Sequence, residues 1–431
     1  RQRQMCIRDR ADETDAVFGE LYSWYLRNPE YRSRVQKLVQ SAFAGKPKDI
    51  ISQSVAKALY GEVSPYSATR LERFAACAFA HFLQYGMKLT ERVEYEFKPM
   101  DMGNVMHEAL ESFAEEVRKR GMKWTELTEQ ERNEIADRCL DNIVADYGNT
   151  VLKSSARNEY MIERTRRILR RTVWALQKQL EQGEFQPEGF EVTFGGGRID
   201  RVDIMEDQNK VYVKVIDYKT GNTSFDLLAL YHGLQLQLMV YLDGALQVEK
   251  RKYPDREIVP AGVFYYNVKD PMIQEKIHAD MESINEQMLK KMKMNGLVQA
   301  DDNMSTKIDS TMASIPVSLN RDGSFSKRSS VASRKQFDAL GAYVRRKICD
   351  IRESILDGNA AVEPYELGKK NACTYCPYLT VCGFDRKIPG YEFHRLSSIE
   401  EDALWKKIMK GEEENCLLYT SPSPRDYAAS R

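Results

Sequence analysis

Two carboxylates and a lysine, in neighbouring strand-forming segments, are the side chains of this chain best suited to chemistry. One segment is Arg198-Ile-Asp-Arg-Val-Asp203 and the other is Val215-Ile-Asp-Tyr-Lys-Thr-Gly221. Asp217 and Lys219 are two residues apart, so on a strand both project from the same face. A hairpin would bring Asp200 alongside them. Two carboxylates that hold a hard divalent cation, with a lysine beside them, suit hydrolysis of a phosphodiester.

We expect Asp200 and Asp217 to bind Mg²⁺, and Lys219 to orient the attacking water or to stabilise the transition state. The alternative is an ordinary hairpin whose charged side chains are exposed. Asp217 follows the apolar segment Val211–Ile216, where a buried carboxylate is costly unless it binds a metal or is paired. This position favours the catalytic interpretation.

A second candidate site lies near the C-terminus, where Cys373, Cys376 and Cys382 are spaced as C-x₂-C-x₅-C. A fourth ligand is needed, and Cys77 is the candidate. On spacing alone, such a set fits structural zinc about as well as an iron–sulfur cluster. The tight clustering favours a metal site in a reducing compartment over a disulfide framework, so we expect a cytoplasmic protein.

Composition limits the remaining functions. The chain has 431 residues, 42% of them apolar, and its 64 Lys and Arg balance its 64 Asp and Glu. With no net charge, any nucleic-acid surface must be local. No apolar run is long enough to span a membrane, and no secretory signal is visible. One local candidate is a helix face with Arg164, Arg167 and Arg171, which we hypothesise binds DNA phosphates; the alternative is a solvated face.

The pattern of elements predicts an α/β fold, with helices before and after a group of strands. Residues 12–60 read as helical, and Thr69 with Glu72 is placed as the capping box of the next helix. Further helix runs from Met102 to about Gln182. The expected strands are Gly189–Phe194, Arg198–Met205, Lys210–Tyr218, Val259–Asn267 and Ser314–Leu319, and the later helices are Leu227–Leu246 and Arg334–Leu356.

The motif Gly197-Arg-Ile-Asp200, followed by Ile216-Asp-Tyr-Lys-Thr-Gly221, resembles the core of the RecB-like PD-(D/E)XK nucleases. Two further elements of that family are present as Gly103-Asn-Val-Met-His107 and Gln237-Leu-Met-Val-Tyr241. The resemblance implies that His107 is an additional metal ligand. It also implies that Gln237 and Tyr241, which share a helix face, contact the DNA backbone or the catalytic lysine. The implied fold is a restriction-endonuclease-like core, a mixed sheet flanked by helices.

One cysteine before these motifs and three after them resemble the iron–sulfur staple of AddB-type nuclease domains. The resemblance implies that Cys77, Cys373, Cys376 and Cys382 hold a 4Fe-4S cluster. It also implies a Mg²⁺-dependent exonuclease for the 5′-terminated strand, paired with an AddA-like helicase–nuclease subunit, that processes double-strand DNA ends for recombinational repair. The alternatives are a stand-alone Cas4-like iron–sulfur nuclease and a non-catalytic DNA-binding scaffold.

These expectations divide the chain into segments. Residues 1–10 and 416–431 resemble translated sequencing-adapter sequence, and we interpret them as non-native. Residues 11–63 are expected to be the helical tail of a preceding helicase-like domain, and residues 64–390 the nuclease domain with its staple. Residues 391–415 are expected to form a C-terminal helical tail. No phosphate loop of the type Gly-x₄-Gly-Lys-[Ser/Thr] occurs in the chain, so any ATP site would lie outside it.

Overall fold

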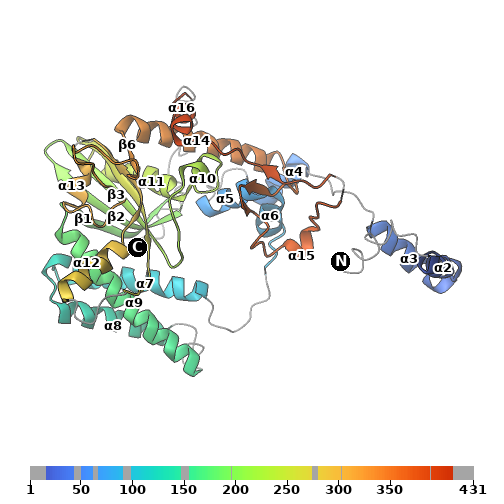
Figure 1. Ribbon diagram of the computed structural model, residues 1–431, viewed down its shortest axis with the longest axis horizontal. Coiled ribbons are helices and arrows are strands. Elements are labelled where there is room, and N and C mark those ends of the chain that lie inside the picture. Colours follow the sequence, from blue (N-terminus) through green and yellow to red (C-terminus); the bar gives the residue numbers. More distant parts are fainter. Residues whose placement is uncertain are drawn as a thin grey trace. The chain divides into compact units, whose positions relative to one another are not determined.

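The computed structural model describes residues 16–42, 50–61, 67–90, 99–146, 155–195, 197–273, 280–301, 303–388 and 390–410 (Figure 1). The segments interpreted as non-native lie outside these ranges. The chain divides into two compact units, each assembled from separate stretches. The first contains residues 1–64, 73–91 and 351–398, and the second contains residues 65–72, 92–350 and 399–431.

A mixed six-stranded sheet forms the centre of the second unit. Its strands, in spatial and chain order, are β1 (Gln186–Phe194), β2 (Gly197–Asp207), β3 (Lys210–Lys219), β4 (Glu257–Asn267), β5 (Asn295–Gln299) and β6 (Val331–Ala332). Strands β3 and β4 are parallel, as are β5 and β6, and the other neighbours are antiparallel. The expectation of an α/β fold with a mixed sheet is confirmed.

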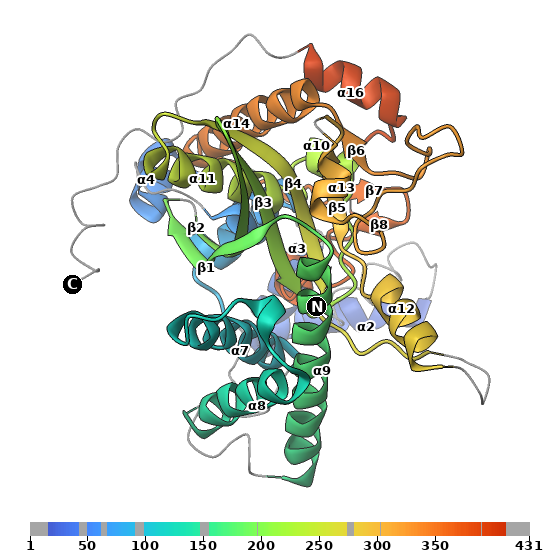
Figure 2. The same cartoon turned by 90° about the vertical axis from the view of Figure 1, so that its left-hand side faces the viewer.

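Helices cover the sheet on both faces (Figure 2). One face packs on α7 (Pro99–Lys119), α8 (Glu129–Asp146) and α9 (Ala156–Glu181), which share its main apolar core. The other face packs on α11 (Gln237–Lys252), and α14 (Arg334–Leu356) lies against that side through an ion pair from Arg345 to Asp243. The single helix expected over Leu227–Leu246 is instead two helices, α10 (Leu227–Tyr231) and α11. Gly233, which lies between them, has a φ of 79° and interrupts the helix.

Within the first unit, short elements surround the cysteines. They are the end of α5 (Ala68–Ala76), α6 (Ala78–His81), a π-helical turn (Phe82–Gly86), α15 (Leu379–Cys382), and a small sheet of β7 (Tyr365–Leu367), β8 (Lys370–Asn371) and β9 (His394–Arg395). Ala80, Leu83 and Tyr378 form a buried cluster against which Cys77 and Cys376 pack. Helices α2 (Ala16–Arg27), α3 (Pro29–Ala42) and α4 (Gln53–Tyr60) confirm the helical reading of the chain's start.

Two local predictions are wrong. Residues 314–319 form no strand; only Leu319 makes an isolated bridge, and the strand that the sheet does use, β5, precedes them. The expected capping box also fails, because the Oγ of Ser67, not Thr69, accepts from an early helical amide, that of Arg70 at 3.4 Å. Glu72 makes a long-range contact instead. No helix in the described ranges is both long and apolar enough to cross a membrane.

Candidate active site and cysteine cluster

Asp200 and Asp217 lie on facing positions of two antiparallel strands. The register of β2 and β3 pairs Arg201 with Ile216, so one step further along the ladder Asp200 faces Asp217. Directly opposite residues of such a pair share a face of the sheet, and here it is the face that α11 covers. An Oδ2 atom of Asp200 accepts a hydrogen bond from the backbone N–H of Tyr218 at 2.7 Å. The hairpin thus brings both motif carboxylates to one edge of the sheet.

Lys219 lies on the same face and points at Asp217. Its ammonium is 2.5 Å from an oxygen of Asp217 and donates to Oε1 of Gln237 at 2.8 Å. It also lies 5.6 Å from the ring centroid of Tyr265, at the face of the aromatic ring where a cation is attracted. The position of this ammonium is therefore set by three separate strand and helix residues.

Gln237 and Tyr241 occupy the first two turns of α11. The Nε2 group of Gln237 donates to the hydroxyl of Tyr241 at 2.8 Å, the contact expected of residues four apart on a helix. The Tyr241 ring packs edge-on against Phe194 of β1, with centroids 5.9 Å apart. Gln237 thus reaches the lysine from the helix side, and Tyr241 supports Gln237. In the described residues the lysine contact is made by Gln237 directly.

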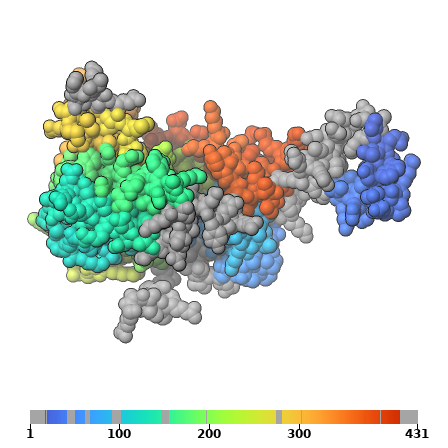
Figure 3. All heavy atoms as spheres, turned by 90° about the horizontal axis from the view of Figure 1, so that it is seen from below, coloured from blue at the N-terminus to red at the C-terminus, as the bar shows by residue number. Residues whose placement is uncertain are grey.

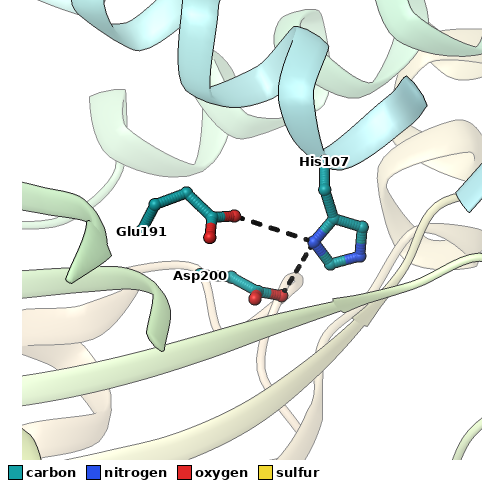
Figure 4. A group of neighbouring side chains, drawn as sticks. All are labelled: His107, Glu191 and Asp200. Atoms are coloured by element: carbon teal, nitrogen blue, oxygen red, sulfur yellow. Dashed lines mark ion pairs between the residues drawn. The ribbon is translucent and has the colours of Figure 1, made fainter. Parts of the chain in front are cut away.

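His107 approaches Asp200 from α7 (Figure 4). Its Nδ1 lies 3.3 Å from an oxygen of Asp200, and its ring packs edge-on against Tyr218, at 6.1 Å between centroids. The apolar face of α7, including Met106, Leu110 and Phe113, is buried in the core. That burial orients the helix so that His107 faces the strand ends.

Glu191 on β1 completes a three-residue group that sequence reasoning missed. One ring nitrogen of His107 and one carboxylate oxygen each of Glu191 and Asp200 lie within 4.8 Å of one another. Arg198 pairs with the other oxygen of Glu191. Asp217 is not part of this group and is paired with Lys219 instead. A signal for Glu191 existed: glycines 195–197 favour a tight hairpin, and the observed pairing of Phe194 with Gly197 aligns Glu191 with Asp200.

The carboxylates of this site are crowded and short of positive charge. Burial, and then the charge of Asp200, raise the pKa of Asp217 to about 7, against the effect of Lys219. Burial and the same charge raise the pKa of Glu191 to about 7. Burial lowers the pKa of His107, but its hydrogen bond and attraction to Asp200 outweigh this and raise it. Buried oxygen ligands that hold protons near neutral pH fit a hard divalent cation, which would neutralise them.

The other acidic residue of the first motif has a different role. Asp203 faces the opposite side of the sheet, where it accepts from Nε of Arg201 at 2.6 Å and lies 2.9 Å from the ammonium of Lys214. All three side chains are buried. Burial opposes ionisation, but the charges of Arg201 and Lys214 hold the pKa of Asp203 below its usual value. This buried cluster, in which one carboxylate pairs with two cations, is structural.

The four predicted cysteine ligands line one small cavity in the first unit. Burial raises the pKa of the Cys373 thiol to about 12, and the three other cysteines add to the effect, because neighbouring thiolates repel one another. Burial also raises the pKa of Cys77, while the backbone N–H groups of Ala80 and Phe79 oppose it. A bound cation would remove this repulsion. No three of these four sulfurs lie within 4.8 Å of one another.

The predicted arginine face belongs to a groove between α8, α9 and α12 (Met281–Lys291), with a volume of about 670 Å³. The surface over α8 and α9 is coloured turquoise to green in Figure 3. Arg166 and Arg170 are occupied by ion pairs to Asp137, and Arg166 pairs also with Asp141 and Glu163. Arg167 and Arg171 share Asp270. Arg164 is exposed and makes no ion pair within the described ranges.

Comparison with known proteins places these residues in a family. The model of the PD-(D/E)XK nuclease superfamily matches residues 65–383. The chain is 40% identical over 429 residues to the B subunit of the ATP-dependent helicase/deoxyribonuclease of Lachnoclostridium phytofermentans, covering 94% of this chain and 37% of that protein. The protein of the same name from Alkaliphilus metalliredigens is 34% identical, with 91% and 36% covered. The chain thus spans little more than a third of the length of these relatives.

Proposed function

Because the chain belongs to the PD-(D/E)XK nuclease superfamily, we propose that it hydrolyses DNA phosphodiester bonds with Mg²⁺, as an exonuclease acting at duplex ends. The observation that carries this proposal is the convergence of Asp200, Asp217 and Lys219 on one edge of the sheet, with His107 3.3 Å from Asp200. A scaffold selected only for stability gains nothing from unbalanced buried carboxylates, whereas a metal-dependent hydrolase requires them.

Each side chain has a defined task in the proposed reaction. Asp200, Asp217 and His107 would hold the metal, and Glu191 would supply a further oxygen ligand. Mg²⁺, when bound, polarises the scissile phosphate and lowers the pKa of water beside it. Lys219 donates hydrogen bonds to the attacking water or to the phosphate oxygens. Gln237, backed by Tyr241, accepts from Lys219 and keeps its ammonium directed at the carboxylates.

We assign the 4Fe-4S cluster to Cys77, Cys373, Cys376 and Cys382. The cavity that all four cysteines line, and their order of one before the nuclease motifs and three after them, support the iron–sulfur group. A cluster that joins residues 77 and 373 closes a long loop, so its task would be to hold the C-terminal segment in place. Iron and sulfide content, measured after anaerobic purification, tests this assignment against zinc.

We assign DNA contact in the α8–α9–α12 groove to Arg164, Arg167 and Arg171. Guanidinium groups bound through several nitrogens, as in Arg166 and Arg170, serve to join α9 to α8. Arg167 is held mainly through Nε, at 2.6 Å from Asp270, which leaves its terminal nitrogens for a phosphate. The exposed ring of Tyr160 lines the same groove, and basic residues beside an aromatic ring suit a single strand.

The wider function rests on the relatives' name. Proteins named as the B subunit of a helicase/deoxyribonuclease imply a second subunit, and we propose an AddA-like helicase–nuclease partner in the cytoplasm. The complex would process double-strand breaks for recombinational repair, with this subunit acting on the 5′-terminated strand. Co-purification of a large helicase from cells that express the full-length protein supports this assignment. A fully active protein without a partner would favour the stand-alone nuclease.

Digestion of end-labelled linear DNA tests the catalytic proposal. The wild-type protein should release nucleotides with Mg²⁺ and not with EDTA, whereas Asp217→Ala should be inactive. Labels placed on the 5′ or the 3′ end report which strand is degraded. Equal digestion by the wild type and Asp217→Ala rejects the assignment, and DNA binding without digestion by either protein identifies a scaffold.

A further inference from the structure

The helix that carries Gln237 and Tyr241 begins without a cap of its own. Leu236, the residue before α11, has a helical backbone and makes no side-chain capping hydrogen bond. The first N–H groups of a helix have no partner within it and need an acceptor. Here the acceptor is Glu72, far away in sequence on α5. One oxygen of Glu72 accepts from the backbone N–H groups of Leu236 at 2.6 Å and of Gln237 at 2.9 Å.

This cap is costly for the protein. Burial raises the pKa of Glu72 to about 7, although both amides and the charge of Lys219 lower it. Ser, Thr, Asp or Asn at position 236 would cap the helix locally and without burying a long-range charge. A buried carboxylate in place of a simple local cap suggests that position and charge at this point matter beyond the stability of one helix.

A continuous series of polar contacts leads from Glu72 to the reacting groups. Glu72 fixes the start of α11, where Gln237 is the first residue. Gln237 in turn accepts from the ammonium of Lys219 at 2.8 Å, and that ammonium lies 2.5 Å from Asp217. A shift at the first residue of α11 would therefore move the partner of the lysine directly.

We infer that Glu72 is a positioning residue for the nuclease centre, which sets the location of Lys219 through Gln237. This inference rests on the proposed nuclease function. A positioning residue differs from a purely structural cap in one respect. A structural cap stabilises the fold, but its loss leaves turnover by the molecules that remain folded unchanged. A positioning residue instead lowers kcat, and its effect disappears once Gln237 no longer links it to the lysine.

A double-mutant cycle separates these roles. Glu72→Gln, Gln237→Ala and the double variant are made in the full-length protein, together with any subunit that co-purifies. Glu249→Gln is the matched control, because Glu249 is a buried carboxylate on the same helix that pairs with Lys252 near its other end. Steady-state hydrolysis of labelled linear DNA is measured over a range of DNA concentrations at saturating Mg²⁺, which gives kcat and KM. Melting temperature and amide exchange over the start of α11 are measured alongside.

We expect Glu72→Gln to lower kcat about ten-fold or more, with KM within about two-fold, since one charge-assisted hydrogen-bond network is weakened. The double variant should be no slower than Gln237→Ala by more than about two-fold, because coupled residues are not additive. Glu249→Gln should lower stability and leave kcat within about two-fold. Amide exchange near Leu236 should be faster in Glu72→Gln than in the wild type, and unchanged in Glu249→Gln.

Unchanged kcat in Glu72→Gln, or rate losses that multiply in the double variant, would overturn the inference and leave Glu72 as a stabilising cap. A wild-type protein without activity on any DNA end would instead reject the nuclease function from which the inference proceeds. The two failures are therefore distinguishable within one set of measurements.

Discussion

Replacing Asp217 by asparagine should abolish nuclease activity and yet stabilise the metal-free protein. The substitution keeps the size of the side chain and removes the charge that burial and Asp200 disfavour. An acid whose pKa is higher in the folded than in the unfolded chain destabilises the fold when it is ionised. Below the unfolded pKa of about 4 the acid is protonated in both states and does not change the free energy of unfolding. Above a pH of about 7 the full loss of stability is present.

The magnitude follows from the pKa of Asp217. A rise from 3.8 to about 7 corresponds to about 4 kcal/mol at alkaline pH, at about 1.4 kcal/mol for each tenfold change in proton affinity. Asparagine still accepts a hydrogen bond from Lys219, and the pKa of Asp217 already includes the attraction of this ammonium, so no separate loss is subtracted. The gain in the free energy of unfolding should be up to about 4 kcal/mol at pH 8 and close to zero at pH 4.

Asp203→Asn is the matched control for Asp217→Asn. It makes the same chemical change at another buried carboxylate, on the neighbouring strand β2 that also carries Asp200. Asp203 pairs with both Arg201 and Lys214, so its loss removes the carboxylate partner of two buried cations and should cost about 3 to 5 kcal/mol. Thermal melting in EDTA at pH 8 measures both, with a rise of a few °C for Asp217→Asn and a fall for Asp203→Asn. Equal destabilisation by the two variants would refute the electrostatic reasoning.

Four further outcomes are expected. Glu191→Gln should weaken Mn²⁺ binding, measured by titration calorimetry, about ten-fold, while Glu188→Gln on the same strand leaves it unchanged; equal affinities would remove Glu191 from the site. Saturating Mg²⁺ should raise the melting temperature more at pH 8 than at pH 6, because protons compete for carboxyls with a pKa of about 7; a larger rise at pH 6 would contradict this. Arg171→Ala should weaken single-strand binding and reduce its salt dependence, whereas Arg170→Ala should mainly lower stability. Cys382→Ser should lose the bound iron, and a variant that retains it would exclude Cys382 as a ligand.

The catalytic strands could be predicted because their sequence pattern is local. Alternation places Asp217 and Lys219 on one face, and the short turn between β2 and β3 limits the hairpin to few registers. The long helices followed from apolar periodicity in the same way. Each of these elements is determined by residues close to one another in the chain.

The remaining features depend on contacts between distant segments. Strand β5 contains the short sequence Asn295-Gly-Leu-Val-Gln299 and becomes a strand only because β4 offers it a partner. Glu72 fitted a capping box by spacing, but the amides at the start of α11, over 160 residues later, compete for its carboxylate. Glu191 needed the register of a second hairpin. In each case tertiary structure decides between local alternatives that the sequence leaves equally open.

The two faces of β2 explain why one motif holds acids with opposite effects on stability. Asp200 and Asp203 are three residues apart, so alternation sends them to opposite sides of the sheet. On one side, Asp203 meets two cations and its charge is balanced. On the other side, Asp200 meets Asp217, and Lys219 and His107 offset part of their negative charge. The excess of negative charge lies on the face that α11 covers, where a divalent cation could bind to it. The same strand can therefore stabilise the fold through one acid while keeping the other available for a metal.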